Sequence, residues 1–139
     1  ATTSRWRPQD VTMTAHEWMA ACDDQVRFQR QWASLFEAFD VVFAPSFGTV
    51  AFPYFEDTHP LERTLTVDGR DTIYFAHLTW PGIATLACLP ATVVPIGLSA
   101  ARLPLSVQVI GPYLEDRTTI AFAKLLEREL GTLRAPLLH

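Results

Sequence analysis

The chain has 139 residues, of which 49% are hydrophobic and 19% charged, so its composition is that of an ordinary globular domain and excludes disordered, collagen-like and coiled-coil proteins. Eleven Lys and Arg against 15 Asp and Glu give a formal net charge of -4, which lacks the basic surface that binding of nucleic acid or an anionic membrane requires. Two distant cysteines, and the lack of any run of about 18 apolar residues, indicate a cytoplasmic protein without disulfides or a membrane span.

The first predicted element is a long amphipathic helix over residues 15–38, preceded by a flexible lead over residues 1–13. Thr14 and Glu17 have the spacing of a capping box, in which the threonine hydroxyl accepts from the third backbone N–H of the helix and the glutamate reaches back. Apolar residues then recur on one predicted face, at Trp18, Cys22, Val26, Trp32, Phe36 and Phe39.

A short strand and a second helix are predicted next, with an irregular segment between them. Residues 41–44 form an unbroken apolar run closed by a proline, which is typical of a strand buried on both faces. Residues 46–69 carry prolines, glycines and charges without periodicity, which indicates a functional or a disordered loop. Asp71 can cap a helix that runs to about Pro81, where the missing N–H of the proline predicts a break near Trp80.

Two β-rich runs follow, over residues 91–96 and 105–110, and the short segment between them predicts a hairpin or a tight meander. Gly97 and Gly111 would allow the strands to end with positive φ.

The last predicted element is a helix over residues 117–130. Asp116 is placed to cap its start, and Gly131 stands at the position that glycine favours just past a helix end. Helices thus alternate with strands along one domain, an order that predicts the α/β class.

No complete active site is visible among these residues. No serine lies in the Gly-x-Ser-x-Gly pattern of a nucleophile elbow, and the single lysine, Lys124, is placed beside Glu127 like a solvated surface cation. The histidines lack the spacing of two metal ligands on one helix face, so neither a metal nor a cofactor is predicted. The serines of the chain are Ser4, Ser34, Ser46, Ser99 and Ser106, and its histidines are His16, His59, His77 and His139.

Several motifs nevertheless form a specific pattern. They are WxxxFxxFDVVFAP at residues 32–45, LPATVVPIG at 89–97, LPLSVQVIGP at 103–112, and EDRTT at 115–119. Together they resemble, in the right order, the closing segment of the amidase signature family.

The resemblance implies a serine-dependent hydrolase that cleaves carbon–nitrogen bonds of carboxylic amides other than peptide bonds. A second serine, a lysine and a Gly/Ser-rich oxyanion loop would serve the nucleophile, and none of these residues matches a position here. We therefore expect residues 14–139 to be the C-terminal segment of an α/β/α layered amidase domain, with a mixed sheet covered by amphipathic helices. Such a segment would supply scaffold and a pocket wall for a small-molecule amide, and would be inactive alone.

Departures from the family pattern indicate which branch of the amidase signature family the chain resembles. Cys88 and Ser106 replace glycines that the family usually has, and both replacements are small. Residues 78–88 contain no Asp or Asn, which the glutamyl-tRNA amidotransferase subunit of this family typically has there, so a general amidase is favoured over that subunit. A non-catalytic binding or interaction domain with an amidase-like fold is the alternative from another class.

Three residues are candidates for the substrate pocket. His77 and Trp80 lie next to Pro81, and each is either a core side chain or part of a pocket wall. Gln108 shares a strand face with Ser106, so it is either a core amide bonded to loop backbone or a polar group lining the pocket. Apolar strands left uncovered would also allow the chain to form a homo-oligomer.

Overall fold

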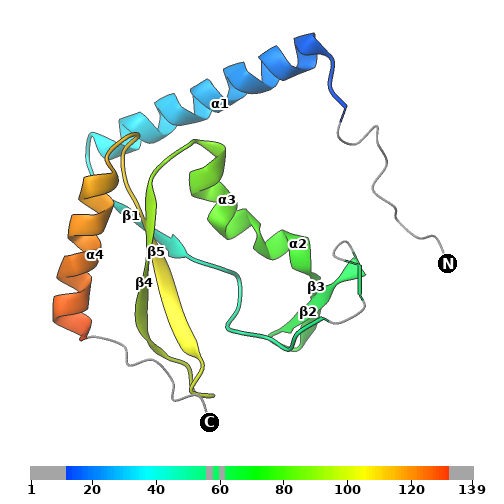
Figure 1. The fold of residues 1–139 in the computed structure, drawn as a ribbon, viewed down its shortest axis with the longest axis vertical. Coiled ribbons are helices and arrows are strands. Elements are labelled where there is room, and N and C mark those ends of the chain that lie inside the picture. The colour runs from blue at the N-terminus through cyan, green and yellow to red at the C-terminus, as the bar shows by residue number, and fades with distance from the viewer. Residues whose placement is uncertain (1–11, 56–57, 60–61, 132–139) are drawn as a thin grey trace.

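The computed structural model describes residues 12–55, 58–59 and 62–131, so most of the predicted N-terminal lead lies outside the described residues. The described chain combines four helices with five strands, and the helices pack on a sheet, which confirms the α/β class (Figure 1). In order, the elements are α1 (Ala15–Phe36), β1 (Val42–Pro45), β2 (Thr64–Val67), β3 (Arg70–Ile73), α2 (Tyr74–His77), α3 (Thr79–Leu86), β4 (Ala91–Leu98), β5 (Pro104–Ile110) and α4 (Asp116–Leu130).

The start of α1 is the predicted capping box. The Glu17 backbone N–H donates to Thr14 Oγ1 at 3.2 Å, and the Thr14 N–H donates to Glu17 Oε2 at 2.7 Å. The backbone N–H of Thr14, and then its hydroxyl, hold the pKa of the Glu17 carboxyl below its usual value. Only the C-terminal part of the predicted apolar face packs on the body, through Trp32 and Phe36, while Trp18 is exposed.

The main sheet has the order β1-β5-β4, and both pairs are antiparallel. The predicted hairpin is therefore confirmed as β4 and β5, with Val94 opposite Val107 and an irregularity between Pro95 and Gly97. Gly97 has φ 145°, a conformation that favours glycine and lets the strand shift register there.

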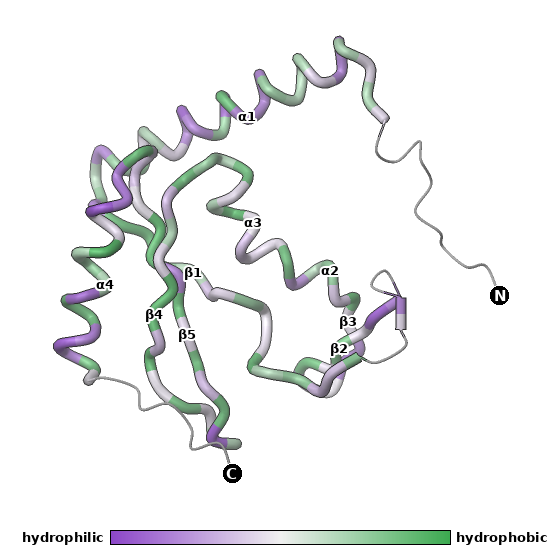
Figure 2. The backbone as a smooth tube through the Cα atoms, in the orientation of Figure 1, coloured by the Kyte–Doolittle hydropathy of each residue, from purple (hydrophilic) through white to green (hydrophobic). Residues whose placement is uncertain are grey.

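Helices cover the two faces of this sheet and give three layers (Figure 1). On one face, the Thr92 hydroxyl donates to Thr119 Oγ1 of α4 at 2.9 Å, and the Phe43 and Phe122 rings meet edge to face at 5.5 Å. On the other face α3 packs against the sheet. Along α4, apolar and polar residues alternate, as expected of a helix with one face on a sheet (Figure 2).

Within the described residues the strands β1 and β4 are not buried on both faces, which is the outcome expected if apolar strand surface of this segment is left uncovered. Val94 is 5% exposed, whereas its neighbour Val93 is 57% exposed, and Phe43 in β1 is 48% exposed. Successive side chains of a strand point to opposite faces, and α4 covers the face of Val94. Val93 is opposite the buried Gln108 and is thus on the face that α3 covers, but it is in the edge strand β4, beyond the α3 core, and stays exposed.

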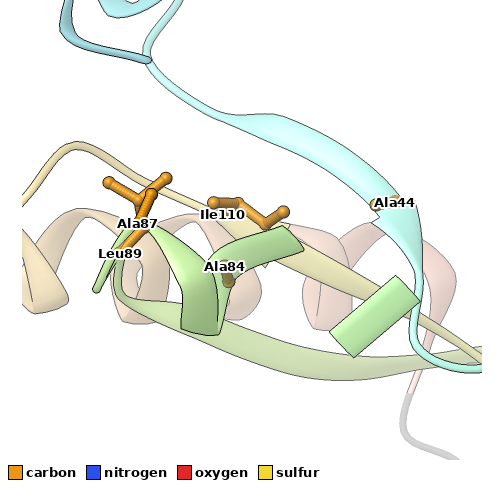
Figure 3. Close-up of a cluster of buried hydrophobic side chains, with 5 residues drawn as sticks. All are labelled: Ala44, Ala84, Ala87, Leu89 and Ile110. Atoms are coloured by element: carbon orange, nitrogen blue, oxygen red, sulfur yellow. The ribbon is translucent and has the colours of Figure 1, made fainter. Parts of the chain in front are cut away.

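The core lies between α3 and the sheet (Figure 3). Three of its side chains are alanines, which let the helix and strand backbones approach closely. Trp32, Phe36 and Ile83 pack around it. The buried residues of this cluster are Ala44, Ala84, Ala87, Leu89 and Ile110.

The second predicted helix is replaced by a hairpin in its first part. Asp71 lies in β3, opposite Thr66 of β2, and accepts from the Thr66 hydroxyl at 2.7 Å. Asp68 and Gly69 turn the chain with φ 51° and 75°, the left-handed pair that an Asp-Gly turn adopts between two strands. This turn signal was present in the sequence and outweighs the capping role assigned to Asp71.

The predicted break near Trp80 is also displaced. The helix axis breaks at Leu78, between α2 and α3, and Pro81 lies in the first turn of α3. The N–H groups of a first turn have no partner within the helix, so proline costs nothing there and causes no kink.

At the start of α4, similarly, Glu115 takes the cap position and Asp116 is the first helical residue, whereas Gly131 ends the helix as predicted.

Gly111 differs from its expected role. Its φ is not positive, but a Cβ at this position would lie 2.6 Å from Thr119 Cγ2 of α4. Glycine is required here for close packing of the strand end against the helix.

Among the described residues, no helix is both long and apolar enough to cross a membrane.

Candidate functional site

Gln108 ties three elements together at the buried centre of the sheet. Its side chain is 3% exposed, and Nε2 donates to the Pro45 carbonyl at 2.8 Å and to the Trp80 carbonyl at 2.7 Å. The amide therefore joins β5 to the end of β1 and to α3. This is the geometry of a core amide bonded to backbone, the first of the two alternatives for this residue.

His77 is held by the hairpin. The ring is 9% exposed, and Nε2 lies 2.7 Å from Thr72 Oγ1, whose hydroxyl donates to the Leu65 carbonyl at 2.9 Å. Because that hydroxyl hydrogen is engaged, Nε2 must carry the ring hydrogen and donate it to Thr72. The ring stacks on Phe47 with centroids 5.6 Å apart, and a Cβ at Gly48 would collide with Nδ1.

Trp80 is partly open to solvent. Its side chain is 38% exposed, and its backbone carbonyl is the one that accepts from Gln108. Two of the three predicted residues contact one segment of chain, residues 45–48. Gln108 bonds Pro45, and His77 packs on Phe47 and Gly48. Trp80 is connected to this segment only through the Gln108 amide.

A pocket of about 610 Å³ lies along this segment. Its lining residues are 45–52, 67–68 and 104–106. None of the three predicted residues is among them, but Gln108 and His77 contact the lining residues Pro45, Phe47 and Gly48 from outside the pocket. Two side chains that were not among the predicted pocket residues do line it: Ser46 and Ser106, whose hydroxyl oxygens are 2.6 Å apart.

The serine pair follows from strand register. Ser46 directly follows β1, and Ser106 lies in β5, whose Val107 is opposite Pro45. The sequence shows both strands but not how they pair, so the pair could be found only once the register was known. Within the described residues, Lys124 is on α4 and lines a separate groove with Val93 and Ile120, so it does not join the serines.

The layered fold is shared with a known amidase. A crystal structure of an amidase has the same fold, with a TM-score of 0.68 and 20% identity over 91% of this chain and 29% of that chain. Residues 3–120 match the Amidase family, and the chain belongs to this family.

Relatives within the family carry two kinds of name. A glutamyl-tRNA(Gln) amidotransferase subunit of Wolbachia pipientis subsp. Culex pipiens (strain wPip) is 36% identical over 98 residues, which are 70% of this chain and 18% of the relative. The fatty-acid amide hydrolase 2-A of Danio rerio is 42% identical over 60 residues, which are 43% of this chain and 11% of the relative. The chain therefore spans about a fifth or less of these relatives.

Proposed function

We propose that this chain is the C-terminal part of a serine-dependent amidase that hydrolyses small-molecule carboxylic amides, and that it supplies scaffold and one wall of the substrate pocket. The observation that carries the proposal is the family match over residues 3–120 combined with the small share of each relative that the chain spans. The chain has no nucleophile elbow and its single lysine is apart from the serine pair, so catalysis would require residues outside these 139.

The first prediction concerns activity. We expect the full-length protein to hydrolyse simple aryl or alkyl amides and the 139-residue chain to show no turnover above background, because the chain lacks an assembled nucleophile and base. Release of ammonia or amine, measured for both under the same conditions, tests this. Turnover by the purified 139-residue chain that Lys124→Ala leaves unchanged would show that an active site within it was overlooked.

The relatives support a second candidate, the corresponding subunit of a glutamyl-tRNA amidotransferase. The lack of Asp and Asn over residues 78–88 argues against it. Hydrolysis of glutamine by the full-length protein, in preference to simple amides, would favour the amidotransferase. If the full-length protein turned over neither substrate, a non-catalytic binding domain would be favoured.

Trp80 tests the pocket assignment within this proposal. Trp80 does not line the pocket formed by these residues, but its exposed side is proposed to face the cleft shared with the catalytic part of the full-length enzyme. There, Trp80→Ala should change the ratio of kcat/KM between amides with bulky and with small acyl groups, because a pocket wall acts on differential binding. The carbonyl that bonds Gln108 belongs to the backbone and is retained in the variant. A lower Tm with an unchanged ratio would instead identify Trp80 as a core side chain.

Two further features belong to the proposal. Cys22 and Cys88 are both free thiols, which fits the reducing, cytoplasmic compartment expected from the sequence.

Exposed apolar side chains such as Val93, Ile96 and Leu98 on β4 support self-association of the 139-residue chain. A clean monomer in sedimentation at tens of micromolar, roughly the regime in which such surfaces associate, would contradict the self-association.

A further inference from the structure

The only charged side chain that lines the pocket along residues 45–52 is negative. Asp68 is the one titratable residue among those that line it, and none of them is Lys, Arg or His. Two opposite charges attract and two like charges repel over the few ångströms of a pocket, so this lining favours a cation and disfavours an anion. Its volume of about 610 Å³ is within the range of small-ligand sites.

The serine pair adds hydrogen-bonding capacity to the same pocket. With the two hydroxyl oxygens 2.6 Å apart, one hydroxyl donates to the other. Ser46 Oγ also lies 3.5 Å from the Ser106 carbonyl. Each hydroxyl oxygen has two lone pairs, so the internal bond leaves acceptor positions free for a ligand. When Ser106 donates to Ser46, the remaining hydrogen, that of Ser46, can bond the Ser106 carbonyl, so that the pair acts toward a ligand as an acceptor. Both side chains are half-buried, so these positions face the pocket at reduced competition from water.

Most of the other lining side chains are apolar, although hydroxyl and backbone groups make nearly half of the pocket surface polar. Val50, Phe52, Val67 and Leu105 come from the loop, the hairpin and β5. The combination is an apolar wall with a cluster of acceptors and one carboxylate, and it has no cation to meet an acid.

We propose that this pocket binds an apolar molecule through a nitrogen that donates hydrogen bonds, preferentially an amine, and that it rejects carboxylates of the same size. The biological ligand rests on the proposed function: in an amidase, the group with this chemistry is the nitrogen side of the amide, which leaves as the amine. The pocket is then a specificity site for that side, formed by Ser46, Ser106 and Asp68.

Three matched probes test the charge preference. Benzylamine, benzyl alcohol and benzoate share an aromatic body and differ in the polar group, and none is an amide that could be turned over. Ligand-observed NMR titration of the full-length protein should give a Kd for benzylamine at least several-fold lower than that for benzyl alcohol, and about tenfold or more lower than that for benzoate. Equal affinity for benzoate and benzylamine, or no binding of any probe, would overturn the proposal.

Variants then locate the binding. Asp68→Asn should weaken benzylamine about 2- to 5-fold, the range of a solvent-exposed ion pair, and leave benzyl alcohol unchanged. Asparagine adopts left-handed φ readily, so the turn at φ 51° is kept. Ser106→Ala should weaken both benzylamine and benzyl alcohol. Glu129→Gln removes one carboxylate from α4 outside the pocket and is the matched control. An equal effect of Glu129→Gln and Asp68→Asn would show a general charge effect and refute the site.

The binding result and the activity result are separable. Amine binding that depends on Asp68, in a full-length protein that hydrolyses no amide, would refute the proposed function and leave the site standing. Amide hydrolysis without Asp68-dependent amine binding would refute the site and leave the proposed function standing.

Discussion

Gln108→Met is expected to lower the free energy of unfolding by about 2–4 kcal/mol, one of the largest effects of any single substitution in the chain. Methionine fills a similar volume but donates no hydrogen bond. The carbonyls of Pro45 and Trp80 would then lose the donor that they share, in two partly buried hydrogen bonds. An unsatisfied buried polar group costs about 1–3 kcal/mol, and water cannot readily replace a side chain that is 3% exposed. Urea unfolding of the protein and the variant measures the difference.

Gln25→Met is the matched control for Gln108→Met. Gln25 Nε2 also donates to a backbone carbonyl, that of Leu86, at 3.0 Å, but this bond is exposed and water can take its place. The control should change the free energy of unfolding by less than about 0.5 kcal/mol. A similar small change for Gln108→Met would mean that the buried amide does not hold β1, β5 and α3 together.

Gly111→Ala is expected to cost about 1–3 kcal/mol of unfolding free energy, because its methyl group would overlap the Thr119 side chain. The Cβ would lie 2.6 Å from Thr119 Cγ2, and Glu115 and Pro90 stand behind at 3.7 and 3.8 Å. Gly82→Ala is the matched control. A Cβ at Gly82 meets nothing within 4 Å and raises helix propensity in α3, so this variant should be unchanged or more stable by up to about 1 kcal/mol.

A double-mutant cycle identifies the colliding group. Thr119→Ser removes Cγ2 and keeps the hydroxyl, which donates to the Asp116 carbonyl and accepts from Thr92, both at 2.9 Å. In the Thr119→Ser background, Gly111→Ala should cost at least about 1 kcal/mol less than in the parent, since the methyl groups no longer meet. Additive costs in denaturant unfolding would place the strain elsewhere than at Thr119.

The sequence by itself determined the elements whose signals are local. The capping box at Thr14 and Glu17 formed as predicted, because both partners lie within one helical turn. The β4–β5 hairpin and the end of α4 at Gly131 were likewise recoverable from short-range patterns. The α/β class and the family follow from their order and from motifs read along the chain.

Tertiary structure decided what depends on partners distant in sequence. Pro81 is harmless because the break at Leu78 puts it in a first turn, and Asp71 is in a strand because Thr64–Val67 pairs with it. His77 and Gln108 were recognised as candidates, but their partners lie on other elements, at Thr72, Pro45 and Trp80.

The serine pair and the glycine contact are of the same kind. Ser46 and Ser106 are 60 residues apart, and only the β1–β5 register brings their hydroxyls to 2.6 Å. Gly111 is required by the approach of α4, which no local pattern around it records. A shift of one residue in strand register reverses every side chain between the two faces, so such contacts are fixed by packing of the whole sheet and not by the residues that make them.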